Sequence, residues 1–239
     1  MNNKLQEDKV KQLFVQKAAI TNTDILHLYK EKEPQILEST VNWRIYTLVQ
    51  QGIIQRIGRG IYRIGESRNF SFDLSAKSVK IGRWVGKEFP YIDYCLWELR
   101  VVNNFTQHLI NYNIIFLDVE REVIDSVYRF LKERDSKVCR IKDIRNDMAD
   151  YAGYICIRPL VTEAPAVKEK AVKVASLEKI LVDLYCDKEF LPFRGNEIYH
   201  IYKNAFDSYT VNQSSMLRYA SRKEKKAEIK DIINSIKRQ

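Results

Sequence analysis

Apolar residues recur at helical spacing in the first part of the chain, and alternating positions follow them. Residues 4–64 therefore predict three helices and then a β-hairpin. A short extended stretch is expected at Ile20–Thr21, between the first two helices. The apolar stripes of the three helices are Val10, Leu13, Phe14 and Ala18; Ile25, Leu26, Leu28 and Tyr29; and Val41, Ile45, Leu48 and Val49.

Capping signals set the expected ends of these helices. Thr23 or Asp24 is a good N-cap for the second helix, and Pro34 prevents that helix from continuing. Ser39 is the expected N-cap of the third helix. Gly52 follows the last turn, where a glycine commonly ends a helix.

The segment 54–64 has strand residues on both sides of Gly58-Arg59-Gly60. This pattern predicts a hairpin whose glycines permit the turn and whose tip carries an arginine. Three helices followed by a two-stranded hairpin are the order of elements in a winged helix-turn-helix.

The outer face of the third helix carries side chains of the kinds that read DNA bases. Thr40, Trp43, Thr47 and Gln50 point away from the apolar stripe, and Asn42 and Arg44 flank its edges, mostly in the first two turns. In helix-turn-helix proteins this part of the second motif helix enters the major groove. One alternative is an ordinary amphipathic helix with a polar outer face, which an exposed Trp43 disfavours. The other is that Trp43 packs against a second domain.

Three arginines belong to the predicted hairpin, at Arg56, Arg59 and Arg63. On a wing they could reach phosphates or the minor groove. A winged helix used only for protein contacts is the competing interpretation.

Residues 67–239 alternate between strand and helix patterns, which favours a mixed α/β domain. Helices are expected around Trp84, at 96–99, at 122–131, after Ser176 and after Asn196, and as a basic amphipathic tail at 214–238. Strands are expected at 91–95, 113–119, 137–141 and 153–157, and a polar surface loop at 162–173. The predicted fold class is α+β: a winged helix-turn-helix domain over residues 1–66, followed by an α/β domain with C-terminal helices over 67–239.

The formal charge of +9 is concentrated at the two ends of the 239-residue chain. Residues 1–64 hold ten Lys/Arg against six Asp/Glu, and residues 218–239 hold eight against three, while the remainder is neutral. Basic ends attract polyanions such as nucleic acid, although they can also serve only solubility. A possible second basic surface on the C-terminal tail comprises Arg218, Arg222, Lys223, Lys225 and Lys226.

Composition narrows the class of protein. The sequence has no apolar run of membrane-spanning length, and its polar, charged N-terminus lacks the pattern of a signal peptide. The four cysteines form no CxxC pattern and are expected to be reduced thiols. We therefore expect a cytoplasmic protein without a membrane partner.

A catalytic site is not evident. The three histidines show no metal-ligand spacing, and no phosphate-binding or nucleophile motif occurs. Asp118 and Glu120, with Asp93 on a neighbouring strand, are the best candidates for a Mg²⁺-dependent nuclease or nucleotidyltransferase. Neither class has its full motif, so we expect no enzyme activity, no cofactor and no metal.

Two stretches carry a resemblance to a known family. Residues 39–54, with 56–62, resemble the AbiEi-type abortive-infection antitoxins, and residues 177–185 look like the C-terminal part of that family. The resemblance implies an N-terminal winged helix, a C-terminal α/β domain and binding to the protein's own operator in double-stranded DNA. It also implies a nucleotidyltransferase-type toxin, countered without a stable complex.

The leading hypothesis is a DNA-binding transcriptional repressor that acts as the antitoxin of a type IV toxin–antitoxin operon and autoregulates its promoter. One alternative is a protein-interaction module without DNA binding. The other is the Mg²⁺-dependent enzyme that would use Asp93, Asp118 and Glu120.

Overall fold

The computed structural model describes residues 5–65, 70–71, 73–144 and 147–236 and has the predicted α+β class. The chain divides into two compact units, residues 1–70 with 206–210, and residues 71–205 with 211–239. The boundary predicted between residues 66 and 67 falls outside the described residues.

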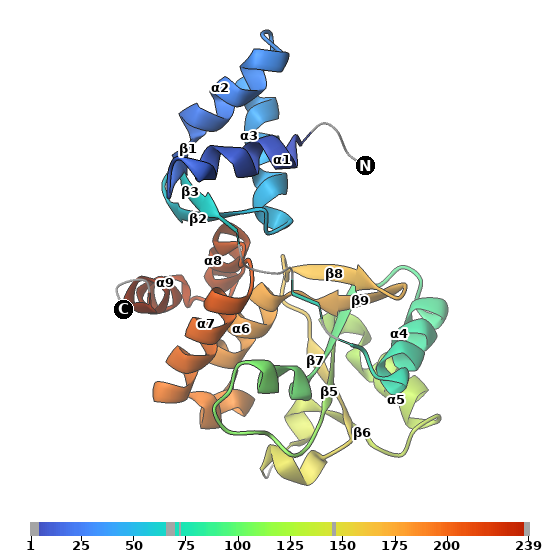
Figure 1. The fold of residues 1–239 in the computed structure, drawn as a ribbon. Helices are drawn as coiled ribbons and strands as arrows, with labels where there is room; N and C mark the ends of the chain where they lie inside the picture. Colours follow the sequence, from blue (N-terminus) through green and yellow to red (C-terminus); the bar gives the residue numbers. More distant parts are fainter. Residues whose placement is uncertain (1–4, 66–69, 72, 145–146, 237–239) are drawn as a thin grey trace. The chain divides into compact units, whose positions relative to one another are not determined.

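The first unit contains three helices and a three-stranded sheet of order β1-β3-β2 (Figure 1). A 3₁₀ turn at Leu13–Val15 extends the first helix. The elements are α1 (Glu7–Gln12), β1 (Ile20–Thr21), α2 (Asn22–Lys32), α3 (Glu38–Gln50), β2 (Ile54–Gly58) and β3 (Ile61–Ile64).

Helix α2 begins earlier than its apolar pattern indicates. Its N-cap is Thr21, whose hydroxyl accepts from the backbone N–H of Asp24, while the Asp24 carboxylate accepts from the backbone N–H of Thr21. The predicted cap at Thr23 or Asp24 is therefore wrong by two to three positions. Asp24 is the reciprocal partner in a capping box.

Helix α3 confirms the predicted apolar stripe, because Val41, Ile45 and Leu48 are buried. Its N-cap is Leu37 without a side-chain hydrogen bond, so the predicted cap at Ser39 is wrong. Gly52 follows the last turn of α3, which confirms the predicted end of the helix. Its φ of 70° is a left-handed conformation that is sterically unfavourable for residues with a side chain.

The predicted hairpin is present. Strand β2 pairs antiparallel with β3, and the short strand β1 pairs with the other edge of β3. Gly60 has a φ of 69° at the turn, next to Arg59. The glycine thus provides the backbone geometry that brings the second strand back.

The second unit is built on a six-stranded mixed sheet of order β6-β7-β5-β4-β9-β8. The pairs β4–β5 and β8–β9 are antiparallel, and the other neighbours are parallel. The strands are β4 (Tyr94–Glu98), β5 (Ile115–Val119), β6 (Val138–Arg140), β7 (Ile155–Pro159), β8 (Ala166–Glu169) and β9 (Val172–Ala175).

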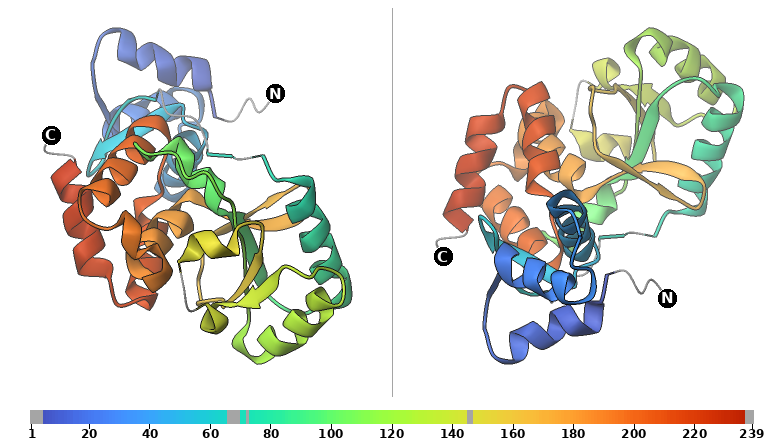
Figure 2. Two further views of the ribbon diagram at one scale, coloured as in Figure 1. Left: turned by 90° about the horizontal axis from the view of Figure 1, so that it is seen from below. Right: turned by 90° about the horizontal axis from the view of Figure 1, so that it is seen from above.

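Helices cover both faces of this sheet. In Figures 1 and 2, α4 and α5 lie on one face, and α6 lies on the other, with α7 and α8 next to it. The helices are α4 (Ala76–Glu88), α5 (Ile124–Lys132), α6 (Leu177–Cys186), α7 (Asn196–Ser208), α8 (Gln213–Arg222) and α9 (Lys226–Ile236).

The central strand β5 shows how the two faces differ. Ile115, Leu117 and Val119 join the apolar core under α4 and α5. Since successive side chains point to opposite faces, Phe116 and Asp118 lie on the face covered by α6. A buried aspartate is therefore placed in the interior by the period of the strand.

Two expectations for this unit are wrong. Residues 96–98 continue strand β4 instead of beginning a helix, and the predicted loop at 162–173 contains most of the hairpin β8–β9. The Leu96 to Leu99 spacing imitates a helical turn, but both faces of β4 are buried. The β8–β9 turn has positive φ at Lys170 and Ala171. Asn-Gly is the usual sequence signal for this turn geometry, so its absence left the hairpin unpredicted.

The predicted single C-terminal tail is also wrong, because it forms the two helices α8 and α9. Glu224, with a φ of 58°, lies in the left-handed region between them. This conformation ends α8 without a glycine or proline signal.

None of the described helices has the length and apolar character needed to cross a membrane. The four cysteines are free thiols, as expected, and Cys95, Cys139 and Cys156 are buried.

Two glycines of α4 provide a test of the packing of this helix on the sheet. A Cβ on Gly82 would lie 2.2 Å from Cγ1 of Val172, whereas a Cβ on Gly86 would lie 3.5 Å from the Tyr94 hydroxyl. We expect Gly82→Ala to lower the stability by about 1–3 kcal/mol through overpacking. Gly86→Ala should raise it by about 0.5–1 kcal/mol through helix propensity.

Urea unfolding followed by circular dichroism measures both changes. Equal effects of the two alanines would show that α4 does not pack on β9 as closely as described.

Candidate functional site

The outer face of α3 is exposed and partly aromatic. Asn42 is exposed, and Trp43 and Tyr46 keep 58% and 53% of their surface accessible. Thr40 and Thr47 are half-buried, and the Thr47 hydroxyl donates to the Trp43 carbonyl at 2.9 Å. Most of the predicted contact residues therefore share one accessible helix face.

Tyr46 belongs to this face, although sequence reasoning did not select it. It lies three residues after Trp43 and four after Asn42, so helical periodicity alone places it beside both. The signal was available on the same helical wheel.

The hairpin presents its three arginines to solvent. Nε of Arg56 donates to the Gly58 carbonyl at 3.0 Å, and Nε of Arg63 donates to Gln55 Oε1 at 2.7 Å. Arg59 is exposed in the turn. The two hydrogen bonds hold their side chains along the hairpin, while the charged groups remain accessible.

Arg44 does not share the exposed face, which corrects its predicted contact with bases. Its side chain is buried, and Nη1 and Nη2 each donate to a carboxylate oxygen of Glu33 at 2.9 Å. The guanidinium also lies 4.7 Å from the ring centroid of Tyr29. Arg44 therefore joins α3 to the end of α2 and is not available to a groove.

The predicted basic surface on the C-terminal helices is largely neutralised, which corrects the second charged expectation. Arg218 and Arg222 pair with Glu163, and Lys225 pairs with Glu228. Lys223 turns inward to two aspartates, and only Lys226 of the five is exposed without a recorded pairing among the described residues. This end of the chain thus offers less free positive charge than its composition indicates.

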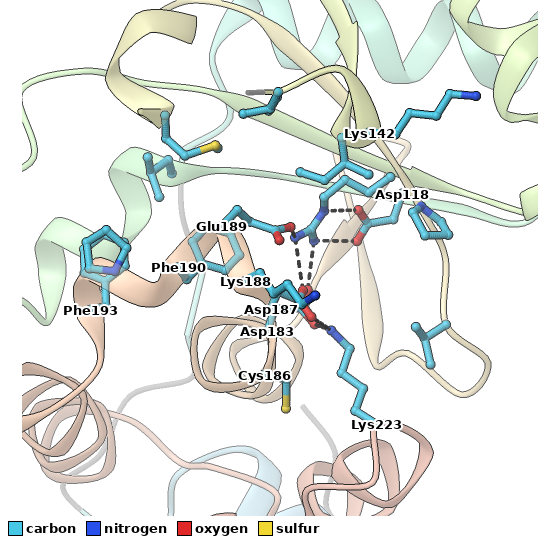
Figure 3. A pocket seen from close by; sticks show the side chains of 18 of the residues that line it. Asp118, Lys142, Asp183, Cys186, Asp187, Lys188, Glu189, Phe190, Phe193 and Lys223 are labelled. Carbon is cyan, nitrogen blue, oxygen red and sulfur yellow. Dashed lines mark hydrogen bonds and ion pairs between the residues drawn. The ribbon is translucent and has the colours of Figure 1, made fainter. Parts of the chain in front are cut away.

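Seven charged side chains gather inside the second unit. We call this group the ion cluster, and Figure 3 shows part of it. Its seven members are Asp118, Arg158, Lys179, Asp183, Asp187, Glu189 and Lys223. They come from strands β5 and β7, from helix α6, from the 3₁₀ segment Lys188–Phe193 (η6) and from the end of α8. Asp187 lies between α6 and η6.

Strand register places the first pair of the cluster. Asp118 on β5 and Arg158 on β7 are direct neighbours in the parallel pairing, and both point toward α6. Lys179 and Asp183 lie four residues apart on α6, so they share one helix face. Lys179 donates to Asp118 and to Asp183.

Arg158 donates from all five of its N–H groups. Nε and Nη2 bind the two oxygens of Asp118 at 2.7 and 3.0 Å, and Nη2 also binds Asp183 at 3.0 Å. Nη1 binds Asp187 at 3.2 Å and Glu189 at 2.9 Å. The guanidinium has no further donor to offer.

The other side of the cluster is closed by α8. Lys223 donates to Asp183 and Asp187 at 2.6 Å each, and the Tyr219 hydroxyl donates to Asp183 at 2.9 Å. Asp183 therefore accepts four hydrogen bonds, two at each oxygen.

The pKa values of the carboxyl groups divide according to these contacts. Arg158 and Lys179 hold the pKa of Asp118 below its usual value against the opposing effect of burial, and Lys179, Lys223 and Arg158 do the same for Asp183. Burial and the charge of Asp183 raise the pKa of Asp187 to about 6. Asp187 is thus the carboxylate with the least compensation.

A cavity of about 880 Å³ opens beside the ion cluster. Asp118, Arg158, Asp183, Asp187, Glu189 and Lys223 line its charged side. Its apolar side includes Ile141, Ile144, Met148, Phe190 and Phe193, and Figure 3 shows Phe190 beside Glu189. This volume is in the range of ligand pockets, which combine apolar walls with a few polar groups.

The structure does not assemble the proposed magnesium site. Asp118 is paired with two cations, and the Asp93 carboxylate is paired with Lys173. Glu120 accepts from the backbone N–H of Asp93 at 2.9 Å. No group of three His, Cys, Asp or Glu side chains suited to a metal ion occurs within the described residues.

Sequence reasoning singled out Asp118 but missed its partners. Arg158 interrupts an apolar strand, and Lys179 and Asp183 interrupt an apolar helix. A charged residue in a buried element needs a partner, so these interruptions were a usable signal. The strand register that brings these residues together could not be predicted from the sequence.

Residues 40–239 match a family described as a family of unknown function (DUF6577). The match begins inside α3 and includes the hairpin, the ion cluster and the cavity. No curated protein matches the chain.

We expect Arg44→Ala to act on stability. The substitution removes two charge-assisted hydrogen bonds and leaves Glu33 without that partner, at a cost of about 1.5–3 kcal/mol. Arg59→Ala, at an exposed arginine of the same unit, should change stability by less than about 0.5 kcal/mol. Thermal unfolding of the two variants measures the difference, and equal stabilities would contradict the placement of Arg44.

Asp187→Asn tests the charge balance of the ion cluster. Because the folded-state pKa of Asp187 is raised from 3.8 to about 6, the wild type should lose stability from this group as pH rises between those values. Carboxyl groups with lowered pKa values make stability increase with pH, but the wild type and Asp187→Asn share these groups, so their effect cancels in the comparison.

The melting temperature of Asp187→Asn relative to the wild type should therefore increase from pH 4 to pH 7 and then level off. Glu133→Gln, at an exposed carboxylate outside the cavity, is the control. A relative melting temperature of Asp187→Asn that falls with rising pH would show that its charge is well compensated.

Proposed function

We propose that this chain, which belongs to the DUF6577 family, is a transcriptional regulator that binds DNA through a winged helix-turn-helix in its first unit. The observation that carries this proposal is the exposed polar and aromatic face of α3, in the same unit as a hairpin with three exposed arginines. In this assignment α3 is the recognition helix and β2–β3 is the wing.

The order and connections of the elements support the assignment. Helix α2 ends before Pro34, and α3 begins at Glu38, so a short turn joins the two helices of the motif. Helix-turn-helix proteins place the N-terminal part of the second helix in the major groove. Asn42 and Trp43 lie in that part of α3.

The side chains fit separate tasks on DNA. An asparagine such as Asn42 can bind an adenine edge through two hydrogen bonds. Trp43 and Tyr46 offer apolar surface and, through their N–H and O–H groups, donors to the backbone. Arg56, Arg59 and Arg63 carry charges that suit phosphates or a narrow minor groove.

The distribution of charge also favours the first unit as the contact surface. Arg218, Arg222, Lys223 and Lys225 are paired with acids within the second unit. The hairpin arginines have no ion pair recorded within the described residues. Attraction to a polyanion is therefore expected to come mainly from the first unit.

The proposal extends to the biological role that the sequence resemblance implies. Residues 39–54 and 56–62, which carry that resemblance, comprise nearly all of α3 and most of the hairpin, and residues 177–185 lie in α6. We propose an antitoxin of the abortive-infection type that represses its own promoter in the cytoplasm. Its toxin would be a nucleotidyltransferase that it counters without a stable complex.

A protein-binding role for the first unit is the second candidate. Leu37, Trp43 and Tyr46 are large, exposed apolar side chains at the start of α3 or along its outer face. Such a group of side chains is common at protein interfaces. It predicts binding that depends little on salt, in contrast to DNA binding.

Binding to DNA from upstream of the protein's own coding sequence, titrated against salt, tests the proposal. Several phosphate contacts predict a steep linear fall of log K with log salt concentration. Asn42→Ala should cost about 1–3 kcal/mol on this DNA and little on a shuffled sequence. Arg59→Ala should weaken binding to both about equally and reduce the salt slope by about 1.

Arg83→Ala, at an exposed arginine of α4 in the second unit, is the matched control and should leave the affinity unchanged. Fluorescence anisotropy of labelled duplexes provides the measurement. Affinity that is flat in salt, or equal for the upstream and shuffled DNA, would reject the repressor and favour the protein-binding role.

A further inference from the structure

We propose that the cavity of the second unit binds a small organic cation, with its ammonium or amidinium group on Asp187 and Glu189 and a flat apolar body against Phe190 and Phe193. This proposal rests on the ion cluster and the cavity alone. It does not depend on DNA binding by the first unit.

The cations of the cluster have almost no capacity left for a ligand. Each of the five N–H groups of Arg158 already donates to a carboxylate. Lys179 and Lys223 each bind two aspartates, so each ammonium retains a single N–H. An anionic ligand could bind Arg158 only by displacing one of its carboxylates.

The carboxylates of the ion cluster differ in how many hydrogen bonds they accept, and the more exposed ones accept fewer. Asp183 accepts four hydrogen bonds and is fully buried. Asp187 accepts two and Glu189 accepts one in the recorded contacts, and their side chains are 22% and 13% exposed. A carboxylate offers about four lone-pair positions, so unused acceptor capacity lies at the cavity side of the cluster.

The charge balance of the ion cluster also favours a cation at the cavity side. Its four carboxylates face three cations, and Asp187 is held at a raised pKa because the neighbouring positive charge does not offset burial and Asp183. A cation at this point would supply the missing charge. Burial strengthens such an interaction relative to water.

Among the described residues, three cations outside the ion cluster line the cavity, Lys142, Lys188 and Arg222. Lys188 is exposed to solvent, and the other two are engaged elsewhere. Lys142 points away from the ion cluster in Figure 3, and its Nζ lies 4.0 Å from Asp125 Oδ1. Arg222 donates to Glu163 at 3.0 Å. Lys142 and Arg222 therefore do not turn the interior into an anion site.

The apolar wall specifies the rest of the ligand. Phe190 is buried and packs at right angles near Phe116, while Phe193 is half-buried at the cavity. Phe190 and Phe193 have centroids 6.3 Å apart. Aromatic walls favour flat rings, and the cavity of about 880 Å³ accommodates one with further substituents.

Three probes of nearly the same shape test the charge that the cavity selects. Benzamidine is a flat cation, benzamide is its neutral counterpart and benzoate is its anionic counterpart. We expect benzamidine to bind the full-length protein with a dissociation constant in the millimolar range, as its size permits. Benzamide and benzoate should bind at least tenfold more weakly. Amide shifts in NMR spectra of the labelled protein report both affinity and location.

Glu189→Gln removes the charge and keeps an oxygen that can accept from Arg158. This variant should weaken benzamidine binding at least tenfold, since charge-assisted hydrogen bonds are the stronger kind. Glu133→Gln, which removes an exposed carboxylate outside the cavity, should leave the affinity unchanged. Phe193→Ala should weaken binding at least threefold and keeps the proposal testable if Glu189→Gln does not fold.

The proposal fails if benzamidine does not bind at 10 mM, or if benzamide binds equally well. Preferential binding of benzoate would instead identify an anion site. A loss of affinity in Glu133→Gln as large as in Glu189→Gln would also overturn it, because the selection would then reflect overall charge.

Discussion

Arg158 is fully buried beneath α6, and its guanidinium donates five hydrogen bonds to four carboxylates. Removing a charged group from water is costly unless opposite charges and hydrogen bonds replace the lost solvent. The four acids come from β5, α6 and the segment that follows α6. The need to satisfy one arginine therefore fixes how the sheet, α6 and η6 are held together.

The same requirement explains the distribution of chemistry around the cavity. The cations of the ion cluster donate nearly all of their N–H groups to its acids. The acids nearest to the cavity, Asp187 and Glu189, accept the fewest hydrogen bonds. A polar interior is often understood as a catalytic site, yet here Asp118 is paired with Arg158 and Lys179. The capacity that remains is that of an acceptor surface beside aromatic rings, which suits binding.

The two units use their basic residues differently. Lys223 enters the ion cluster, and Arg218, Arg222 and Lys225 pair with acids on the surface, so the charge of the C-terminal end is largely internal to the second unit. In the first unit Arg44 is also internal, but Arg56, Arg59 and Arg63 remain exposed. Net charge by segment was therefore a poor guide to surface charge, because salt bridges decide which charges a partner can reach.

Local patterns in the sequence were sufficient for the order of elements in the first unit. The apolar stripe of Val41, Ile45 and Leu48 and the glycines at 52 and 60 determine α3 and the hairpin, since spacing and backbone freedom act within a few residues. The hairpin β8–β9 escaped prediction because its turn uses Lys170 and Ala171 in place of glycine. The strand at 96–98 was not predicted because a strand buried on both faces lacks the alternation of apolar and polar residues that identifies a strand.

The sequence by itself also determined that Asp118, Arg158, Lys179 and Asp183 stand as charged residues within apolar segments. Only the tertiary structure decided that they meet, because the pairing of β5 with β7 and the packing of α6 and α8 bring into contact positions up to 61 residues apart. It likewise decided that Arg44 faces Glu33 and not solvent. Side-chain partners across the fold depend on register and packing, and no local pattern carries that information.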